Sequence, residues 1–318
     1  MRVAAIDCGT NTMRLFVASL NPDGSLHEYD RRLLFVGLGQ GVDATGLFAP
    51  DALNRAFDAC EQFNEIIADL DCERGRFVAT SATRDAQNRD ELFRGVRARL
   101  GINAEVVSGQ EEAHLSFRGA LSGIRSKPDP VLVMDSGGGS TELVRGVGAG
   151  ADLAHIDASV SLNIGSRRLR ERILRSDPPT ADEIARARQL VRSELDSSGV
   201  ELSDIRTFIG VAGTVTTMSA LAQHLRRYDR SRVHGSVLSQ AAVHEVADRL
   251  LGATVSEVVS WGPVQPQRAE VLCAGALIVE EVASRVGAPE LVVSESDILD
   301  GIALSMLVDG KGQAISAD

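Results

Sequence analysis

The chain has 318 residues, enough for two domains of ordinary size, and its 44% hydrophobic and 24% charged residues are typical of a folded globular protein. Its net charge of −11 argues against a dedicated nucleic-acid binder, because such proteins carry a basic surface. No apolar run reaches the roughly 20 residues of a membrane span and no signal-peptide pattern opens the chain, so we expect a cytoplasmic protein that binds neither nucleic acid nor membrane.

The first part of the sequence alternates strand-like and helix-like patterns. Residues 2–20 predict two strands joined by a turn that carries Asp7, Gly9 and Asn11. Further patterns predict, in order, a strand (27–42), a helix (49–70), a strand that enters a Ser/Thr loop (76–83), a helix that ends at Gly101 (89–101), and a strand, a turn and a helix (104–124).

The segment "RSKPDP", residues 125–130, is the best candidate for a domain boundary, because two prolines and mixed charges separate two patterned regions. The second region opens with "VLVMDSGGGSTELV", residues 131–144. It continues with a helix (185–196), a strand, a Gly/Thr loop and a helix (205–221), a helix (267–287), and a strand, an acidic loop and a helix (290–308). This alternation indicates an α/β protein.

Two stretches of the sequence repeat one pattern. "VAAIDCGTNTMRLFVA" and "VLVMDSGGGSTELVRG" each place an apolar strand before an aspartate, a tight turn rich in glycine or hydroxyl groups, and a second apolar strand. Each predicts a β-hairpin with an anion-binding tip, and we expect the two tips to face each other across a cleft. An ordinary glycine hairpin would explain either loop alone, but the shared aspartate favours the functional interpretation.

The residue types in both tips suit phosphate and metal. Glycines let backbone N–H groups approach phosphate oxygens closely, and hydroxyl and amide side chains add donors. The loop residues expected to bind phosphate are Gly9, Thr10, Asn11 and Thr12 in the first tip, and Gly137, Gly138, Gly139, Ser140 and Thr141 in the second. Asp7, Asp135 and Glu142 offer hard oxygen ligands for Mg²⁺, with Mn²⁺ as a substitute.

Several motifs together resemble the exopolyphosphatase/guanosine pentaphosphate phosphohydrolase (Ppx/GppA) family. They are "AAIDCGTNTMRL", "ATSATRDAQNRDEL", "SGQEEAHLSFRGAL", "VMDSGGGSTELV", "GVAGTVTTM", "GSRRLRERILRSDPPT", "RAEVLCAGALIV" and "SESDILDGIAL". The resemblance covers nearly the whole chain in its short two-domain form. It implies an α/β fold of two actin-like domains (acetate and sugar kinase/Hsp70/actin, ribonuclease H-like) flanking a cleft. We expect domain I at 1–125 and domain II at 126–299, with a last helix at about 300–318 packing on domain I.

Phosphoanhydride hydrolysis needs a positioned water, a base, and positive charge on the phosphoryl oxygens. Glu111 and Glu112 open a predicted helix, where consecutive residues point about 100° apart, so at most one should aim into the cleft. Both could instead simply stabilise the N-terminal turn of the helix. The resemblance assigns the catalytic role to Glu112 and places Arg84 and Asn88 at the phosphate site.

Two other features of the sequence remain open between function and structure. Gly213 and Thr214 in "GVAGTVTT" resemble a third phosphate-facing loop at a helix N-terminus, but a close-packed strand-to-helix turn would look the same. Five arginines within 167–175 could attract a multi-phosphate tail, although a solvated helix is an equally good explanation.

The resemblance implies an exopolyphosphatase that removes terminal phosphate from inorganic polyphosphate, with short chains as expected substrates, by Mg²⁺-assisted attack of water with Glu112 as base. The alternative substrate is guanosine pentaphosphate. Other classes are an actin-like ATPase or sugar kinase and a non-catalytic polyphosphate sensor; the glutamates of "SGQEEAH" argue against the former. The resemblance also implies a homodimer.

Overall fold

The computed structural model describes residues 1–124, 128–147 and 155–315, and the chain divides into two compact units. Unit 1 consists of Met1–Gly119 and Ile298–Asp318, and unit 2 of Ala120–Asp297. The division falls within helix α5 (Gly109–Gly123). The boundary expected at 125–130 lies partly outside the described residues, which omit 125–127.

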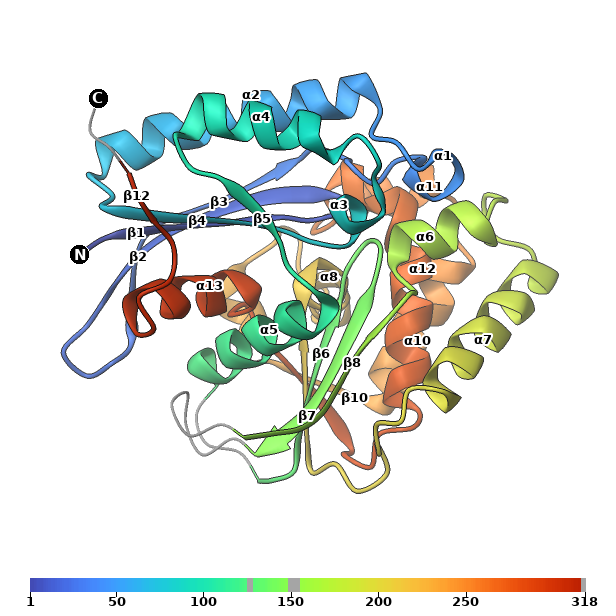
Figure 1. Ribbon diagram of the computed structural model, residues 1–318. Helices are drawn as coiled ribbons and strands as arrows, with labels where there is room; N and C mark the ends of the chain where they lie inside the picture. The colour runs from blue at the N-terminus through green and yellow to red at the C-terminus, as the bar shows by residue number, and fades with distance from the viewer. Residues whose placement is uncertain (125–127, 148–154, 316–318) are drawn as a thin grey trace. The chain divides into compact units, whose positions relative to one another are not determined.

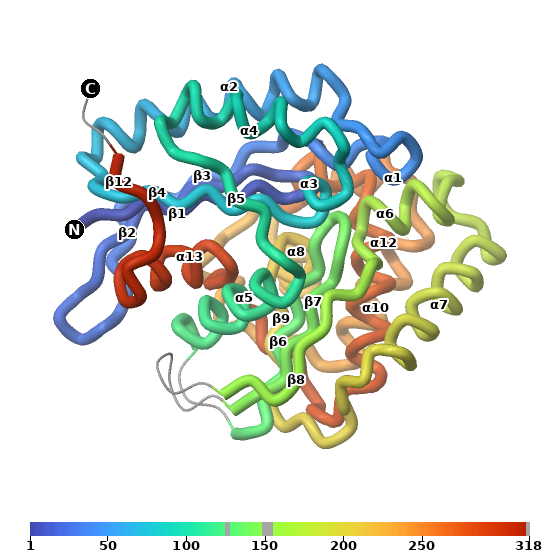
Figure 2. The backbone as a smooth tube through the Cα atoms, in the orientation of Figure 1, coloured from blue at the N-terminus to red at the C-terminus, as the bar shows by residue number. Residues whose placement is uncertain are grey.

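Unit 1 contains a mixed sheet around strand β1. Its strands are ordered β12 (Gln313–Ala314), β4 (Arg74–Ala79), β1 (Val3–Cys8), β2 (Thr12–Leu20) and β3 (Leu26–Phe35), and β5 (Ala104–Val106) also pairs with β4. Strand β1 is antiparallel to β2 and parallel to β4. The short strand β12 adds the far end of the sequence to this sheet, beside β4 (Figure 2).

Helices cover both faces of the unit 1 sheet. Helices α2 (Pro50–Asp69) and α4 (Arg89–Leu100) lie on one face, and α13 (Ile298–Leu307) lies on the other (Figure 1). Side chains of a strand alternate between faces, so Ala4 and Ile6 pack in the α2 and α4 cluster while Val3 and Ala5 pack in the α13 cluster. This double burial explains why β1 is a continuous apolar run.

Two short helices complete unit 1 at the ends of strands: α1 (Val42–Thr45) and α3 (Ser81–Asp85). The prediction of a Ser/Thr loop after β4 was wrong at this point, because Ser81–Asp85 forms a short helix. Serine and threonine are favoured at helix starts as well as in turns, so their presence alone did not distinguish the two.

Unit 2 repeats the arrangement of strands. Its sheet has the order β10 (Val237–Ser239), β11 (Glu290–Val293), β9 (Thr207–Val211), β6 (Val131–Ser136), β7 (Thr141–Val147) and β8 (His155–Leu162). Strand β6 is antiparallel to β7 and parallel to β9, as β1 is to β2 and β4. The hairpin of each unit is therefore the start of a similar mixed sheet.

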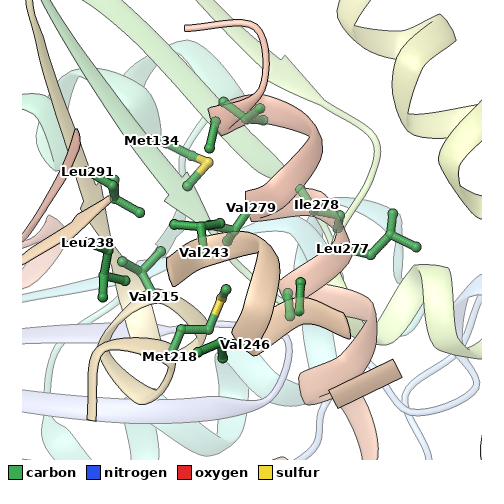
Figure 3. Packing of buried hydrophobic residues seen from close by; sticks show 14 of the residues in the cluster. Met134, Val215, Met218, Leu238, Val243, Val246, Leu277, Ile278, Val279 and Leu291 are labelled. Carbon is green, nitrogen blue, oxygen red and sulfur yellow. The ribbon is translucent and has the colours of Figure 1, made fainter. Parts of the chain in front are cut away.

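The core of unit 2 forms around helix α12 (Pro266–Ala283), which is buried along most of its length. The other helices of this unit are α6 (Ser166–Arg172), α7 (Ala181–Asp196), α8 (Ala212–Ala222), α9 (Arg230–Val233), α10 (Gln240–Leu251) and α11 (Val255–Ser260). Met134 of β6, Met218 of α8 and Val243 of α10 lie on the side of α12 that carries Val279 (Figure 3). Among the described helices, none combines the length and apolar character needed to span a bilayer.

Candidate functional site

The two predicted hairpins are present and close in the same way. The last strand pairs are Cys8 with Met13 and Ser136 with Thr141, which leaves four residues in each turn, 9–12 and 137–140. The first turn residue donates to the fourth in both: Gly9 N lies 2.9 Å from Thr12 O, and Gly137 N lies 3.0 Å from Ser140 O. The repeat seen in the sequence is thus a repeat of backbone geometry.

Helix α6 orients the glycine turn of unit 2. The bonds run from Ser166 N to Gly137 O (2.9 Å), from Arg167 N to Gly138 O (2.9 Å) and from Arg168 Nε to Gly139 O (2.8 Å). The N–H and C=O of a trans peptide point in opposite directions, so the N–H groups of residues 138–140 point away from α6. Three successive N–H groups on one side form a concavity suited to an anion.

Gly165, which the sequence reasoning missed, and Arg168, which it named only as part of the basic run, support this turn. A Cβ atom at Gly165 would lie 2.5 Å from the main-chain carbonyl of Gly138, so only glycine lets α6 approach the turn. The Arg168 side chain is buried against Gly139, and Arg170 donates to the carbonyls of Leu174 and Ser176. Arg168 and Arg170 of the basic run are therefore held by backbone carbonyls, whereas Arg172 and Arg175 are exposed.

Asp135 and Glu142 form a buried acidic pair beside the glycine turn. They are direct cross-strand partners on β6 and β7, and only 8% and 1% of their surfaces are exposed. Ser161 Oγ of β8 donates to Glu142 Oε1 at 2.6 Å. Like charges directly opposite each other destabilise a sheet, so this pair suits a divalent cation with a preference for oxygen ligands. The Thr141 hydroxyl is engaged elsewhere, donating to Ile164 O at 2.8 Å.

The corresponding pair in unit 1 has a different charge. Asp7 faces Arg14 across β1 and β2, where the first hairpin has arginine in the place that Glu142 takes in the second. Arg14 Nε and Nη2 lie 2.9 and 2.7 Å from Asp7 Oδ2. Because Arg14 already pairs with this carboxylate, Asp7 would have to give up that contact to bind a metal ion.

The two glutamates at the start of α5 contact different arginines. Glu112 Oε2 lies 2.6 Å from Arg84 Nη1, and Glu112 is 7% exposed. Glu111 Oε1 lies 2.7 Å from Arg76 Nη2. This divergence follows from the rotation of about 100° between consecutive helical residues. The structure thus brings together Arg84, on α3, and Glu112, which the sequence named separately.

Asn88 has a structural explanation. Its side-chain Oδ1 accepts from Phe48 N at 2.8 Å, and its Nδ2 donates to Phe48 O at 3.2 Å. Both ends of the amide are used by one main-chain segment, so a phosphate contact is not needed to account for this residue.

Gly213 and Thr214 lie inside the first turn of α8, not in a loop before the helix as expected. A Cβ atom at Gly213 would lie 1.7 Å from Arg268 Nη1, so the guanidinium of this α12 residue packs against the start of α8. Arg268 was not singled out from the sequence. It places positive charge at a helix N-terminus, where an anion would also be favoured.

His244, Asp248 and Glu280 are a second group of side chains that could hold a metal ion. His244 Nδ1 lies 2.5 Å from Glu280 Oε1, and Nε2 lies 3.2 Å from Asp248 Oδ2. The two ring nitrogens point in different directions, so a metal ion held by this group would bind one nitrogen and the two carboxylates. With a carboxylate at each nitrogen, this geometry fits a charged imidazolium that bridges α10 and α12. The hydrogen bond to Glu280 and the charges of Asp248 and Glu280 raise the pKa of His244.

Comparison with known proteins identifies the family to which this site belongs. Residues 21–309 match the model of the Ppx/GppA phosphatase family. The chain belongs to the Ppx/GppA phosphatase family. It is 47% identical over 319 residues to exopolyphosphatase 2 of Mycobacterium tuberculosis, covering 96% of this chain and 98% of the relative. The expected family is therefore confirmed.

Solved structures of Ppx/GppA proteins confirm the expected fold class. An exopolyphosphatase-like protein has a TM-score of 0.90 at 42% identity, covering 96% of this chain and 97% of that chain. The Aquifex aeolicus member of the Ppx/GppA family has a TM-score of 0.82 at 29% identity, covering 98% and 99%. Two mixed α/β sheets in an actin-like fold are thus shared with Ppx/GppA proteins.

Proposed function

We propose that this Ppx/GppA protein is an exopolyphosphatase, which hydrolyses the terminal phosphoanhydride bond of inorganic polyphosphate. The observation that carries the proposal is the contact between buried Glu112 and Arg84, because it joins a candidate base to a candidate phosphate ligand at 2.6 Å. Similarity to a relative named exopolyphosphatase 2 supports polyphosphate as the substrate.

In the proposed mechanism, Glu112 orients the attacking water and accepts its proton. The planar guanidinium of Arg84 donates to phosphoryl oxygens. When a phosphate takes over Arg84, the carboxylate of Glu112 loses a cationic partner and becomes a better base. Within unit 2, the N–H groups of residues 138–140 form a second candidate site for phosphate oxygens.

Asp135 and Glu142 would hold Mg²⁺. Their burial and direct cross-strand pairing fit such an ion, which prefers carboxylate oxygens as ligands. When bound, the ion would offset negative charge on the phosphate oxygens. Asp7 is left out of this ligand set because Arg14 already balances its charge.

A homodimer stays a prediction from the resemblance, and sedimentation equilibrium would test it.

Phosphate release tests this function. Polyphosphates of several lengths, guanosine pentaphosphate and ATP are each incubated with the protein in Mg²⁺ or EDTA. We expect release from polyphosphate in Mg²⁺, and a loss of roughly 10²- to 10⁴-fold in Glu112→Gln. Glu91→Gln, which removes an exposed glutamate from the first turn of α4, is the matched control and should keep full activity.

Two results would contradict the proposal. Unchanged turnover in Glu112→Gln would remove the assigned base, while release from guanosine pentaphosphate but not from polyphosphate would replace the assigned substrate.

A further inference from the structure

Arg76 is a buried arginine of unit 1 that the proposed chemistry does not use. It lies on β4 and is only 3% exposed. Its guanidinium donates to Glu105 of β5, to Glu111 Oε1 of α5 at 2.7 Å and to Ser305 Oγ of α13 at 2.9 Å. Lys311 Nζ adds a weaker contact to Glu111 at 3.4 Å. One side chain therefore connects two strands and two helices.

Because Arg76 is buried, each of its contacts is needed. A guanidinium removed from water must keep its donors paired, and Arg76 has carboxylates on two sides and a hydroxyl on the third. Desolvation alone would lower the pKa of Arg76, but Glu105 and Glu111 more than compensate and raise it. Desolvation would likewise raise the pKa of Glu111, yet Arg76 and Lys311 keep it lowered. Both partners of the Arg76–Glu111 pair are thus charged.

The position of Glu111 matters because Glu112 follows it directly. Ser108 caps the same turn: its Oγ accepts from Glu111 N at 3.2 Å and its carbonyl from Glu112 N at 2.9 Å. If the first turn of α5 rotated, the two glutamates could exchange their arginine partners. Because Arg76 is fixed by β5 and α13, it can accept only one rotation of α5, the one that leaves Glu112 to Arg84.

We propose that Arg76 is a positioning residue, which by binding Glu111 fixes the first turn of α5 and reserves Arg84 for Glu112. The inference rests on the proposed role of Glu112 as the base. It adds that the pairing of Glu112 with Arg84 is selected by a residue that contacts neither the substrate nor the attacking water. Its loss should lower kcat more than it weakens binding, because Glu112 is misplaced while Arg84 only exchanges one carboxylate partner for another.

Arg76→Met tests the inference. We expect kcat on polyphosphate to fall on the order of 10- to 100-fold, the effect of a displacement of about 1 Å, with KM changed less than about twofold. Adding Glu111→Met removes the glutamate that competes for Arg84, so the double variant should recover most of the lost kcat. A purely structural arginine would give the opposite result, since a second core change adds to the damage.

Arg118→Met is the matched control. Arg118 Nη1 lies 2.5 Å from Asp309 Oδ2, so it is another ion pair between α5 and the C-terminal segment, less than two helical turns beyond the base. It should leave kcat unchanged. If Arg76→Met does not fold, Arg76→Lys and Arg76→Lys/Glu111→Gln give the same comparison, with kcat lowered in the single variant and recovered in the double.

Amide hydrogen exchange provides a readout that does not depend on activity. Residues 110–113 should exchange faster in Arg76→Met than in wild type, and equally in Arg118→Met and wild type. An unchanged kcat in Arg76→Met, an equal loss in the double variant, or unchanged exchange at 110–113 would each overturn the inference. If the wild type lacks polyphosphate hydrolysis, the proposed function fails instead, while the exchange result still stands.

Discussion

Replacing Glu142 by glutamine would test the acidic pair of unit 2 without relying on catalysis. The substitution preserves the shape of the side chain and an oxygen that can accept from Ser161, and it removes one of two charges on a directly opposed cross-strand pair. Such pairs have Cβ atoms about 5 Å apart, and two charges at that separation repel by about 3 kcal/mol at an effective dielectric constant near 20. The hydroxyl of Ser161 offsets part of this repulsion.

Glu142→Gln removes one ligand of the proposed ion, so Mg²⁺ should stabilise the wild type more than the variant. An ion present at 100 times its Kd stabilises the folded state by about 2.7 kcal/mol, and the variant, which lacks one ligand, should gain much less. For a domain of this size each kcal/mol shifts Tm by roughly 2–4 °C.

The assay is a thermal melt of wild type and Glu142→Gln, each with EDTA and across a Mg²⁺ titration. Glu290→Gln is the control, because Glu290 is an exposed glutamate at the start of β11 in the same sheet. It should respond to Mg²⁺ as the wild type does. An equal Mg²⁺ response in wild type and Glu142→Gln would refute the assignment of the metal to this pair.

Three further predictions concern other parts of the chain. Gly165→Ala places a Cβ atom 2.5 Å from the Gly138 carbonyl, so it should cost about 1–3 kcal/mol in a urea melt and reduce phosphate release, whereas Gly252→Ala, whose Cβ atom meets nothing closer than 3.4 Å, should not. The pKa of His244 is raised in the folded state, so its stabilising contribution is complete below about pH 6.5 and is lost as pH rises through the folded value. The Tm difference between wild type and His244→Gln should accordingly be largest near pH 6 and vanish near pH 9; a constant difference would contradict the charged bridge. Burial raises the pKa of Cys60 to about 12 and that of Cys72 to about 11, so at pH 8 iodoacetamide should label both only after unfolding.

The helices and hairpins whose formation depends on residues close in the sequence were predicted from the sequence. The helix expected at 49–70 is observed as Pro50–Asp69, because its apolar residues recur with the helical period and Pro50 suits the first turn. The two hairpins followed from short apolar strands around glycine-containing turns. Serine and threonine at 80–83 fit a loop and a helix start equally well. A loop was predicted there, and the structure forms α3.

The candidate site was only partly readable, because its decisive contacts join distant residues. Arg84 and Glu112 are 28 positions apart, and their 2.6 Å contact depends on how β4, α3 and α5 pack. The choice between Glu111 and Glu112 came from the family resemblance, since both suit a helix start equally well. Gly165 carried no signal, because the reason for a glycine there is the carbonyl of Gly138 on another element.

The way the chain completes unit 1 has a consequence for its synthesis. The sheet face that carries Val3, Ala5 and Phe16 is covered by Ile302 and Met306 of α13. A ribosome makes these two residues after every residue of unit 2, so unit 2 can fold first while the nascent unit 1 still exposes an apolar sheet face. Such a face invites chaperone binding or aggregation until translation passes α13. The first unit to be translated is thus the last one able to finish folding.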